Sequence, residues 1–194
     1  MAALRYGRVS MLLHWLIGFA LLGQIAFGLL LDEIAPRGTP ARAGVINLHK
    51  SFGMVLGCLI LARLAWRLLH RPPAWPESMP AWQRRAAQIG HRALYACMIV
   101  MPLSGTIASN FSKHGIMLFG TMLKPWGPDL PQVYALFNGL HVATAFVFCA
   151  LIVGHVLVTL KHALIDHDAV FARMWPGASD ELTTPSFPRS QASP

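Results

Sequence analysis

Residues 137–164 read FNGLHVATAFVFCALIVGHVLVTLKHAL, an apolar run that carries His141 and His155 fourteen residues apart. On an α-helix, fourteen steps return a side chain to within about 40° of its starting direction and advance it about 21 Å along the axis. The hydrocarbon core of a bilayer is about 30 Å thick. One membrane helix would therefore point two imidazoles the same way, one near each edge of the membrane.

The whole chain has the composition of a membrane protein. Hydrophobic residues make up 55% of its 194 residues and charged residues only 12%, unlike an ordinary soluble domain. Four apolar runs are long enough to span a bilayer, at about 10–31, 48–69, 90–109 and 137–164. We therefore expect an all-α membrane protein, a four-transmembrane-helix bundle formed by residues 1–175. Residues 176–194 are rich in Ser, Thr and Pro and are predicted to be a disordered tail.

The basic residues predict that both termini are cytoplasmic. Ten of them precede the first run, border or fill the connection between the second and third, or follow the fourth: Arg5, Arg8, Arg67, Arg71, Arg84, Arg85, Arg92, Lys161, Arg173 and Arg189. Five lie on the other side: Arg37, Arg42, Lys50, Lys113 and Lys124. Cytoplasmic segments carry the excess of positive charge. The net charge of +8 then follows from topology and suits anionic lipid headgroups, so we do not invoke nucleic acid.

Four histidines inside the apolar runs form two predicted pairs. Because successive spans alternate in direction, His14 and His155 lie near the cytoplasmic edge, and His49 and His141 lie near the outer edge. Each could be an interior polar residue that is hydrogen-bonded across helices. Polar groups at membrane depth are costly and usually functional, and four of them in two level pairs favour two haems, each held by two axial imidazoles.

Other cofactor chemistry fits these pairs less well. Neither pair has a nearby Cys, Asp or Glu to complete the coordination of zinc or copper. Cys58, Cys97 and Cys149 lie singly within the spans, which is typical of small apolar residues in helix packing. The chain has no C-x-x-C-H motif, so covalent attachment of haem is excluded and any haem is bound non-covalently.

Further residues are candidates for the haem pockets. Gly53 and Gly105 would give a flat porphyrin the clearance it needs between helices, although small residues also serve ordinary helix packing. Arg63 lies deep enough in its span to need a partner, for which a haem carboxylate is the first choice. Arg67, one turn further, is a second candidate to bind a haem carboxylate, or its side chain extends to the membrane surface. His91 is a candidate to hydrogen-bond a haem carboxylate.

A quinone site is predicted beyond the inner pair. His162 follows His155 by seven residues, about 20° round the same face and near the cytoplasmic surface. A titratable imidazole there could exchange protons with a quinone head group, or it could be a residue at headgroup level. His91 is a second candidate for this quinone site. At the outer side, the apolar segment Gly115–Gly120 is too short to span and is interpreted as an interfacial cover for the outer cofactor.

These residues together resemble the prokaryotic cytochrome b561 family of four-helix di-haem membrane proteins. The resemblance covers about residues 5–176. The segments that carry it are Leu13-His14-Trp15, Asn47-Leu48-His49-Lys50-Ser51, Arg63-x-x-Trp66-Arg67, Gly90-His91-Arg92-x-x-Tyr95, Pro102-x-Ser104-Gly105 and the His141/His155 pair. It implies that His14, His49, His141 and His155 are axial ligands of two b haems in a multi-pass protein of the bacterial inner membrane.

One branch of that family is similar to superoxide oxidases, which pass electrons from periplasmic superoxide to ubiquinone. By this resemblance, His162 and His91 belong to the quinone region and the basic outer surface faces superoxide. Related four-helix cytochromes are instead haem subunits that carry electrons between a partner redox protein and the quinone pool. A haem-free transporter with a proton relay is a remote third reading. The sequence permits an oligomer, but no motif specifies one.

Overall fold

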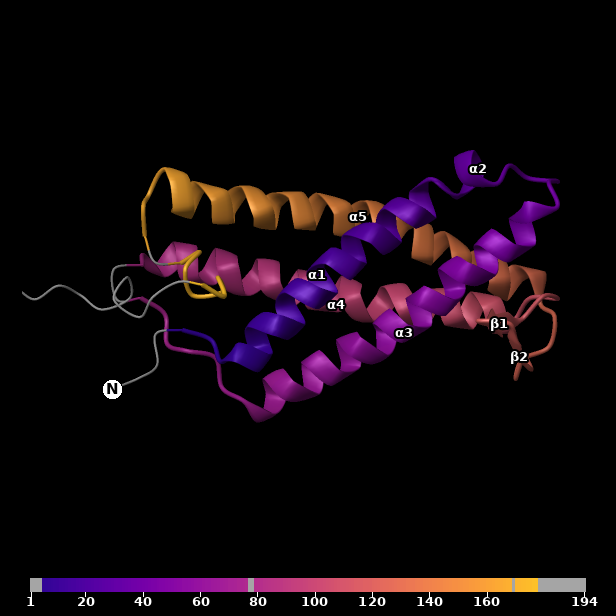
Figure 1. The fold of residues 1–194 in the computed structure, drawn as a ribbon, viewed down its shortest axis with the longest axis horizontal. Helices are drawn as coiled ribbons and strands as arrows, with labels where there is room; N and C mark the ends of the chain where they lie inside the picture. Colours follow the sequence, from indigo (N-terminus) through magenta and orange to yellow (C-terminus); the bar gives the residue numbers. More distant parts are fainter. Residues whose placement is uncertain (1–4, 77–78, 169, 178–194) are drawn as a thin grey trace, which may run out of the picture.

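The computed structural model describes residues 5–76, 79–168 and 170–177. Four long helices form the molecule: α1 (Arg8–Leu29), α3 (Ala41–Leu69), α4 (Ala81–Asn110) and α5 (Pro131–Leu164) (Figure 1). The connections hold a one-turn helix, α2 (Leu31–Ile34), and two short strands, β1 (Ile116–Leu118) and β2 (Thr121–Leu123). All four long helices are apolar and long enough to cross a membrane, so the predicted four-span bundle is confirmed. Residues 178–194, most of the predicted tail, lie outside the described residues.

Three of the long helices begin several residues before the predicted spans. Prolines mark these starts: Pro40 and Pro80 precede α3 and α4, and Pro131 is the first residue of α5. Proline fits a helix start because its fixed φ is helical and its missing N–H is not needed there. The 34 residues of α5 extend about 51 Å, so this helix projects beyond a hydrocarbon core of about 30 Å.

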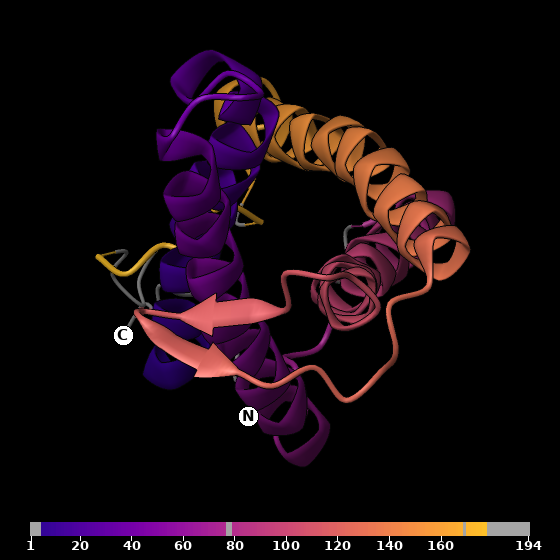
Figure 2. The ribbon, with the colours of Figure 1, turned by 90° about the vertical axis from the view of Figure 1, so that its right-hand side faces the viewer.

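The helices pack in the order α1, α3, α4, α5. Among the described elements, α1 has extended backbone contact with α3, α3 with α4, and α4 with α5, while α5 has none with α1 or α3. The end-on view shows that α5 lies beside α4 and apart from α3 (Figure 2). Side chains from α5 must therefore reach across the bundle to meet those of α1 and α3.

One apolar layer crosses the middle of the bundle. It includes one buried residue from each long helix that lies seven positions after a histidine: Leu21, Leu56, Met98 and Phe148. Seven residues amount to about two turns, so each of these four side chains lies on the same helix face as its histidine. Phe148 is only 1% exposed and lies midway between His141 and His155 on α5. The layer therefore separates the two levels at which the histidines lie.

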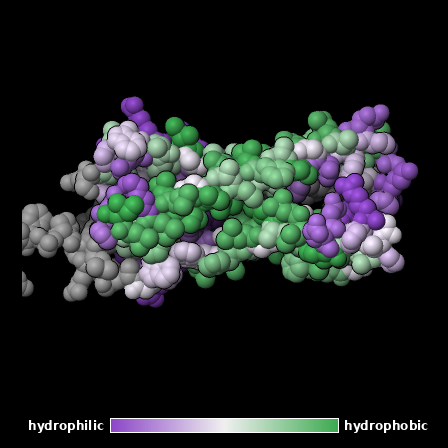
Figure 3. Space-filling model, turned by 90° about the horizontal axis from the view of Figure 1, so that it is seen from above, coloured by the Kyte–Doolittle hydropathy of each residue, from purple (hydrophilic) through white to green (hydrophobic). Residues whose placement is uncertain are grey.

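The face of the bundle seen in Figure 3 is apolar over its middle and more polar toward its ends. Large hydrophobic side chains are exposed along all four helices, including Phe19, Leu61, Leu103 and Phe146. Such a contiguous exposed surface is unusual for a soluble monomer. In a membrane it faces lipid, and the polar ends meet water.

Both ends of the described chain lie at one end of the bundle, here called the terminal end. An Arg5 guanidinium nitrogen donates to the carbonyl of Trp175 over 2.8 Å, and the Tyr6 amide donates to the Arg173 carbonyl over 3.3 Å. Arg173 in turn donates to the carbonyls of Pro73 and Ala74 in the α3–α4 connection. That this end faces the cytoplasm stays a prediction from the basic residues.

The opposite end, here called the hairpin end, carries an antiparallel β1–β2 hairpin that the sequence analysis did not predict. Phe119 and Gly120 form its turn with φ of 44° and 92°, the positive values that a tight two-residue hairpin turn requires. Ser51 on α3 is 1% exposed; its hydroxyl accepts from the Phe119 amide and lies within hydrogen-bond distance of the Met117 carbonyl, each at 3.0 Å. The segment interpreted as an interfacial cover is thus a hairpin attached to α3.

Candidate functional site

The structure brings the four predicted ligand histidines together in the two expected pairs. The ring centres of His14 and His155 lie 6.2 Å apart, and those of His49 and His141 lie 6.3 Å apart. The ring planes are inclined by 76° in the first pair and 88° in the second. The first pair lies at the terminal end and the second at the hairpin end, so α5 supplies one histidine to each.

These spacings fit two imidazoles on opposite sides of one metal ion. A metal–imidazole bond is about 2.0 Å long, and a ring nitrogen lies about 1.2 Å from its ring centre, so trans imidazole centres are about 6.4 Å apart. Both observed distances come within a few tenths of an ångström of that value. The donor set, two neutral nitrogen ligands without a carboxylate or thiolate among the described neighbours, suits a haem iron whose four other ligands come from the porphyrin.

At the hairpin end, His141 has a hydrogen bond that prepares its other nitrogen for a metal. Its Nδ1 lies 2.9 Å from the carbonyl oxygen of Met101 on α4. A carbonyl only accepts, so Nδ1 carries the proton and Nε2 keeps a free lone pair. Metal-bound histidines in proteins commonly have such a backbone partner.

His49 and His14 have donors beside Nδ1 instead. The Gln24 side-chain amide nitrogen lies 3.2 Å from Nδ1 of His49 and donates to the His49 carbonyl over 2.7 Å. A guanidinium nitrogen of Arg63 lies 3.3 Å from Nδ1 of His14. A ring that accepts at Nδ1 carries its proton on Nε2. Metal binding at Nε2 would move that proton to Nδ1, and the contact with the neighbouring donor would then have to change.

Glycines allow the close approach of the histidines at the hairpin end. A Cβ added at Gly28 would lie 2.9 Å from Cε1 of His49, and one at Gly105 would lie 3.1 Å from two ring atoms of His141. A Cβ at Gly53 would lie 3.2 Å from the Gln24 amide nitrogen. The glycines that the sequence assigned to a haem pocket therefore leave room for the histidines and the partner of His49.

At the terminal end, His91 and Arg63 lie beside the histidine pair. The His91 ring lies 5.6 Å from that of His155, so three imidazoles from three helices gather at this level. Arg67 does not reach the pair: its guanidinium lies 5.9 Å from the Tyr6 ring centre and 5.8 Å from that of Tyr95. Its partners are aromatic faces, which attract cations.

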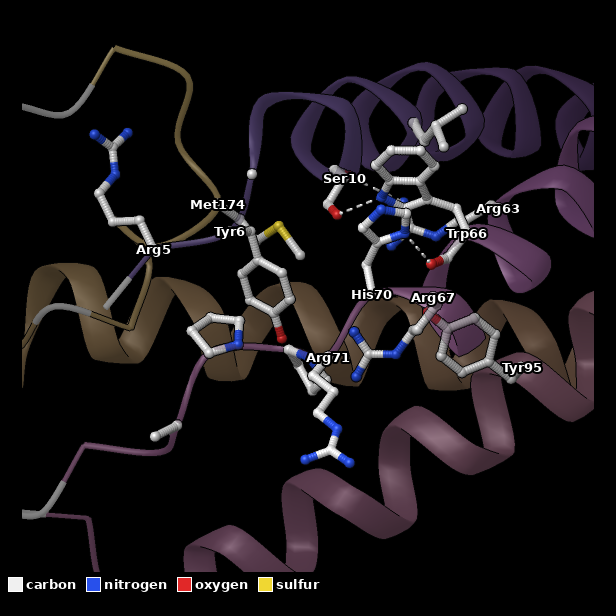
Figure 4. Close-up of a pocket in the computed structure, with 15 residues that line it drawn as sticks. Arg5, Tyr6, Ser10, Arg63, Trp66, Arg67, His70, Arg71, Tyr95 and Met174 are labelled. Carbon is white, nitrogen blue, oxygen red and sulfur yellow. Dashed lines mark hydrogen bonds between the residues drawn. The ribbon is translucent and has the colours of Figure 1, made fainter. Parts of the chain in front are cut away.

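A basic cavity of about 360 Å³ opens beside this pair (Figure 4). Four arginines line it, and no described acidic residue does: Arg5, Arg63, Arg67 and Arg71. One wall is held by Trp66, whose ring nitrogen donates to the Ser10 hydroxyl over 3.1 Å and whose ring stacks on His70. The cavity can therefore accept an anionic group near His14.

His162, the predicted quinone residue, lies on the last turn of α5 and is buried, with 7% of its surface exposed. Its Nδ1 lies 2.6 Å from a carboxylate oxygen of Asp168 and 3.3 Å from one of Asp166. Lys161 contacts both carboxylate oxygens of Asp166, and this hydrogen bond holds the pKa of Asp166 below its ordinary value. His162 thus stands among charged groups at the terminal end.

Comparison with known proteins decides the family. The family model described as prokaryotic cytochrome b561 matches residues 5–177. The chain belongs to the prokaryotic cytochrome b561 family. It is 33% identical to cytochrome b561 homolog 2 of Escherichia coli K12 over 172 residues, 88% of this chain and 90% of that protein. It is 25% identical to cytochrome b561 homolog 1 of the same organism over 173 residues, 89% of this chain and 97% of that protein.

Membership of the prokaryotic cytochrome b561 family confirms the resemblance inferred from the motifs. It makes the chain a multi-pass protein of the bacterial inner membrane that binds b-type haem and transfers electrons across the membrane. The sequence analysis missed two residues that contact the predicted site, Gln24 and Asp168. Gln24, a polar residue in an apolar span, was a usable signal, whereas Asp168 follows the last helix and reaches His162 only because the chain turns there.

Proposed function

We propose that this cytochrome holds two b haems and passes electrons from superoxide at the hairpin end to ubiquinone at the terminal end. The observation that carries the proposal is the pair of nearly equal histidine spacings, 6.2 and 6.3 Å, at two levels of one bundle. His141 and His155 set these levels about 21 Å apart along α5. The proposed axial ligands are His14 with His155 and His49 with His141.

The haems supply one-electron chemistry, and the protein fixes where it occurs. Held by two histidines each, such haems would exchange electrons without readily binding oxygen. Met101 orients His141 through its carbonyl, and Gly28 and Gly105 leave room for the rings. The layer around Phe148 makes the space between the two levels apolar.

Arg63 and Arg67 are proposed to bind haem carboxylates at the terminal end. Arg63 contacts Nδ1 of His14, and that nitrogen would be a donor if Nε2 held iron. Two donors repel, so the guanidinium would then need another acceptor. The basic cavity beside it offers the room, and an arginine–carboxylate pair is among the strongest hydrogen-bonded contacts. His91, against His155, is proposed to border the same haem.

Superoxide is favoured as the donor because the hairpin end has cations close to a histidine pair. Lys50 adjoins His49 in the chain, and its ammonium group donates to the Gly115 carbonyl over 2.8 Å. Lys113 and Lys124 flank the hairpin. Fixed positive charge attracts small anions and raises their encounter rate. Each superoxide gives up one electron and becomes O₂.

Ubiquinone is proposed to bind near His162 and His91, at the terminal end. Reduction of one quinone to quinol takes two electrons, from two superoxide anions, and two protons. His162 is buried at the last turn of α5, where it can exchange protons between water and a ligand in the membrane. Under the predicted orientation these protons come from the cytoplasm.

The test uses the purified, haem-loaded protein in detergent. We expect two b haems per chain, and reduction of a short-chain ubiquinone when superoxide is generated enzymatically. Superoxide dismutase should abolish the reaction. A chain with two haems that reduces quinone only after chemical reduction, and never with superoxide, would be an electron carrier for a partner protein. A single haem per chain would contradict the paired-ligand assignment.

A further inference from the structure

The C-terminal end of α5 contains a histidine–aspartate pair that the proposed electron path does not itself require. His162 is buried, and its Nδ1 lies 2.6 Å from Oδ2 of Asp168. A carboxylate can only accept when it is ionised, so the proton of this hydrogen bond stays on Nδ1. The other ring nitrogen, Nε2, is then the atom through which His162 exchanges protons with anything else.

The chain holds Asp168 in place from both sides. The amide of Val170 donates to Oδ1 of Asp168 over 2.9 Å, which leaves Oδ2 for the histidine. The amide of Asp168 donates to the carbonyl of His162 over 3.2 Å. The turn after α5 therefore fixes the carboxylate against the ring.

Asp166 is the competing carboxylate, and its contacts differ. It lies 3.3 Å from Nδ1 of His162, but both of its oxygens contact the Lys161 ammonium, at 2.7 and 2.5 Å. Lys161 therefore neutralises Asp166. Asp168 has no such cation among the described residues.

We propose that Asp168 is the positioning residue of His162 in quinone reduction: it fixes the proton on Nδ1 and stabilises the positively charged ring that donates from Nε2. This inference rests on the proposed function, because it needs quinone at the terminal end. The quinone takes up two electrons. His162 gives one proton from Nε2 to a reduced quinone oxygen, forming its O–H bond, and regains a proton from water. The second proton also comes from water, and Asp168 stays ionised throughout.

The experiment measures the half-reaction at the terminal end alone. Purified haem-loaded protein is reduced chemically, freed of reductant and mixed rapidly with short-chain ubiquinone while haem oxidation is followed by absorbance. We expect Asp168→Asn to slow oxidation at saturating quinone about tenfold or more, a part of the roughly 10²–10⁴-fold that general acid catalysis contributes, with an unchanged quinone concentration at half-maximal rate. Asp168→Glu should restore most of the rate, and Asp166→Asn should stay within about twofold of wild type.

A double-variant cycle separates positioning from general stability. Residues that act as one unit are non-additive, so His162→Gln combined with Asp168→Asn should be no slower than His162→Gln alone. Haem content and the reduced-minus-oxidised spectrum should match wild type in every variant. The inference is overturned by multiplicative losses, by loss of haem in Asp168→Asn, or by an equal effect of Asp166→Asn. If quinone does not oxidise the wild-type protein, the proposed function itself is wrong. If quinone oxidises wild type and Asp168→Asn equally fast, only the inference about Asp168 is wrong.

Discussion

The two ends of the bundle present histidine pairs of nearly the same size in different surroundings. At the hairpin end, His49 and His141 lie among neutral groups, the Gln24 amide and the Met101 carbonyl, with Lys50 held on the hairpin. At the terminal end, His14 touches Arg63, and a cavity lined by four arginines opens beside it. The two histidine pairs therefore have nearly the same spacing, but the charged groups around them differ.

This difference bears on the direction of electron flow. An oxidised haem iron carries one more positive charge than a reduced one, so nearby arginines favour the reduced state. The haem potential is set by ligands, hydrogen bonds and burial together, and with like ligands at both ends the arginines become the main contrast. We expect the terminal-end haem to have the higher potential and to receive the electron.

The largest expected effect comes from removing one ligand. His141→Ala should lose the hairpin-end haem and keep most of the other, so the haem content falls to about half, while His14→Ala should lose the terminal-end haem instead. Haem per chain and the reduced-minus-oxidised spectrum measure this. His114→Ala, which changes a loop histidine, serves as the control. Full haem content in His141→Ala would contradict the pairing.

A glycine substitution should weaken one end selectively. The Cβ of Gly28→Ala would lie 2.9 Å from the His49 ring, and overpacking typically costs about 1–3 kcal/mol. We expect about tenfold weaker retention of the hairpin-end haem, measured by haem loss to an apoprotein acceptor. Gly23→Ala on the same helix, where a Cβ meets nothing within 4 Å, should behave as wild type. Equal haem loss in the two variants would argue against a specific contact.

Removing an arginine tests the electrostatic contrast. Arg63→Met keeps a long side chain without its charge and should lower the potential of the terminal-end haem by about 60 mV, one tenfold change for one electron. Spectroelectrochemical titration should show the other haem unchanged. Arg37→Met, at an exposed position of the hairpin end, is the matched control. A shift of both haems, or of neither, would remove Arg63 from the terminal site.

The smallest effect concerns the hairpin alone. Ser51→Ala removes the hydroxyl that contacts the Met117 carbonyl and the Phe119 amide, a loss of about 1 kcal/mol. A thermal scan should show slightly lower stability with both haems retained. Ser112→Ala changes a loop serine whose hydroxyl donates to the nearby Ser109 carbonyl, and it should change stability less. Loss of the hairpin-end haem in Ser51→Ala would mean that the hairpin helps to hold that cofactor.

The sequence predicted the helices and histidine levels well because both depend on simple periodicity. Apolar runs located the four spans, and the fourteen-residue interval located His141 and His155. The same runs could not locate the polar first turns of α3 and α4, which are helical but extend beyond the apolar part. The hairpin turn was missed because Phe119 takes a positive φ, which non-glycine residues seldom adopt. The contact between Asp168 and His162 depends on a turn that no periodic pattern describes.

The distance between the two histidine levels has an electrical consequence. About 21 Å of a hydrocarbon core of about 30 Å lies between His141 and His155, and the buried layer around Phe148 keeps that interval apolar. A full crossing of one elementary charge changes its energy by about 2.3 kcal/mol for every 100 mV of membrane voltage. An electron passing between the levels spans about two-thirds of that field. In the proposed orientation it moves toward the negative side, so an energised membrane slows each turnover and a depolarised one speeds it.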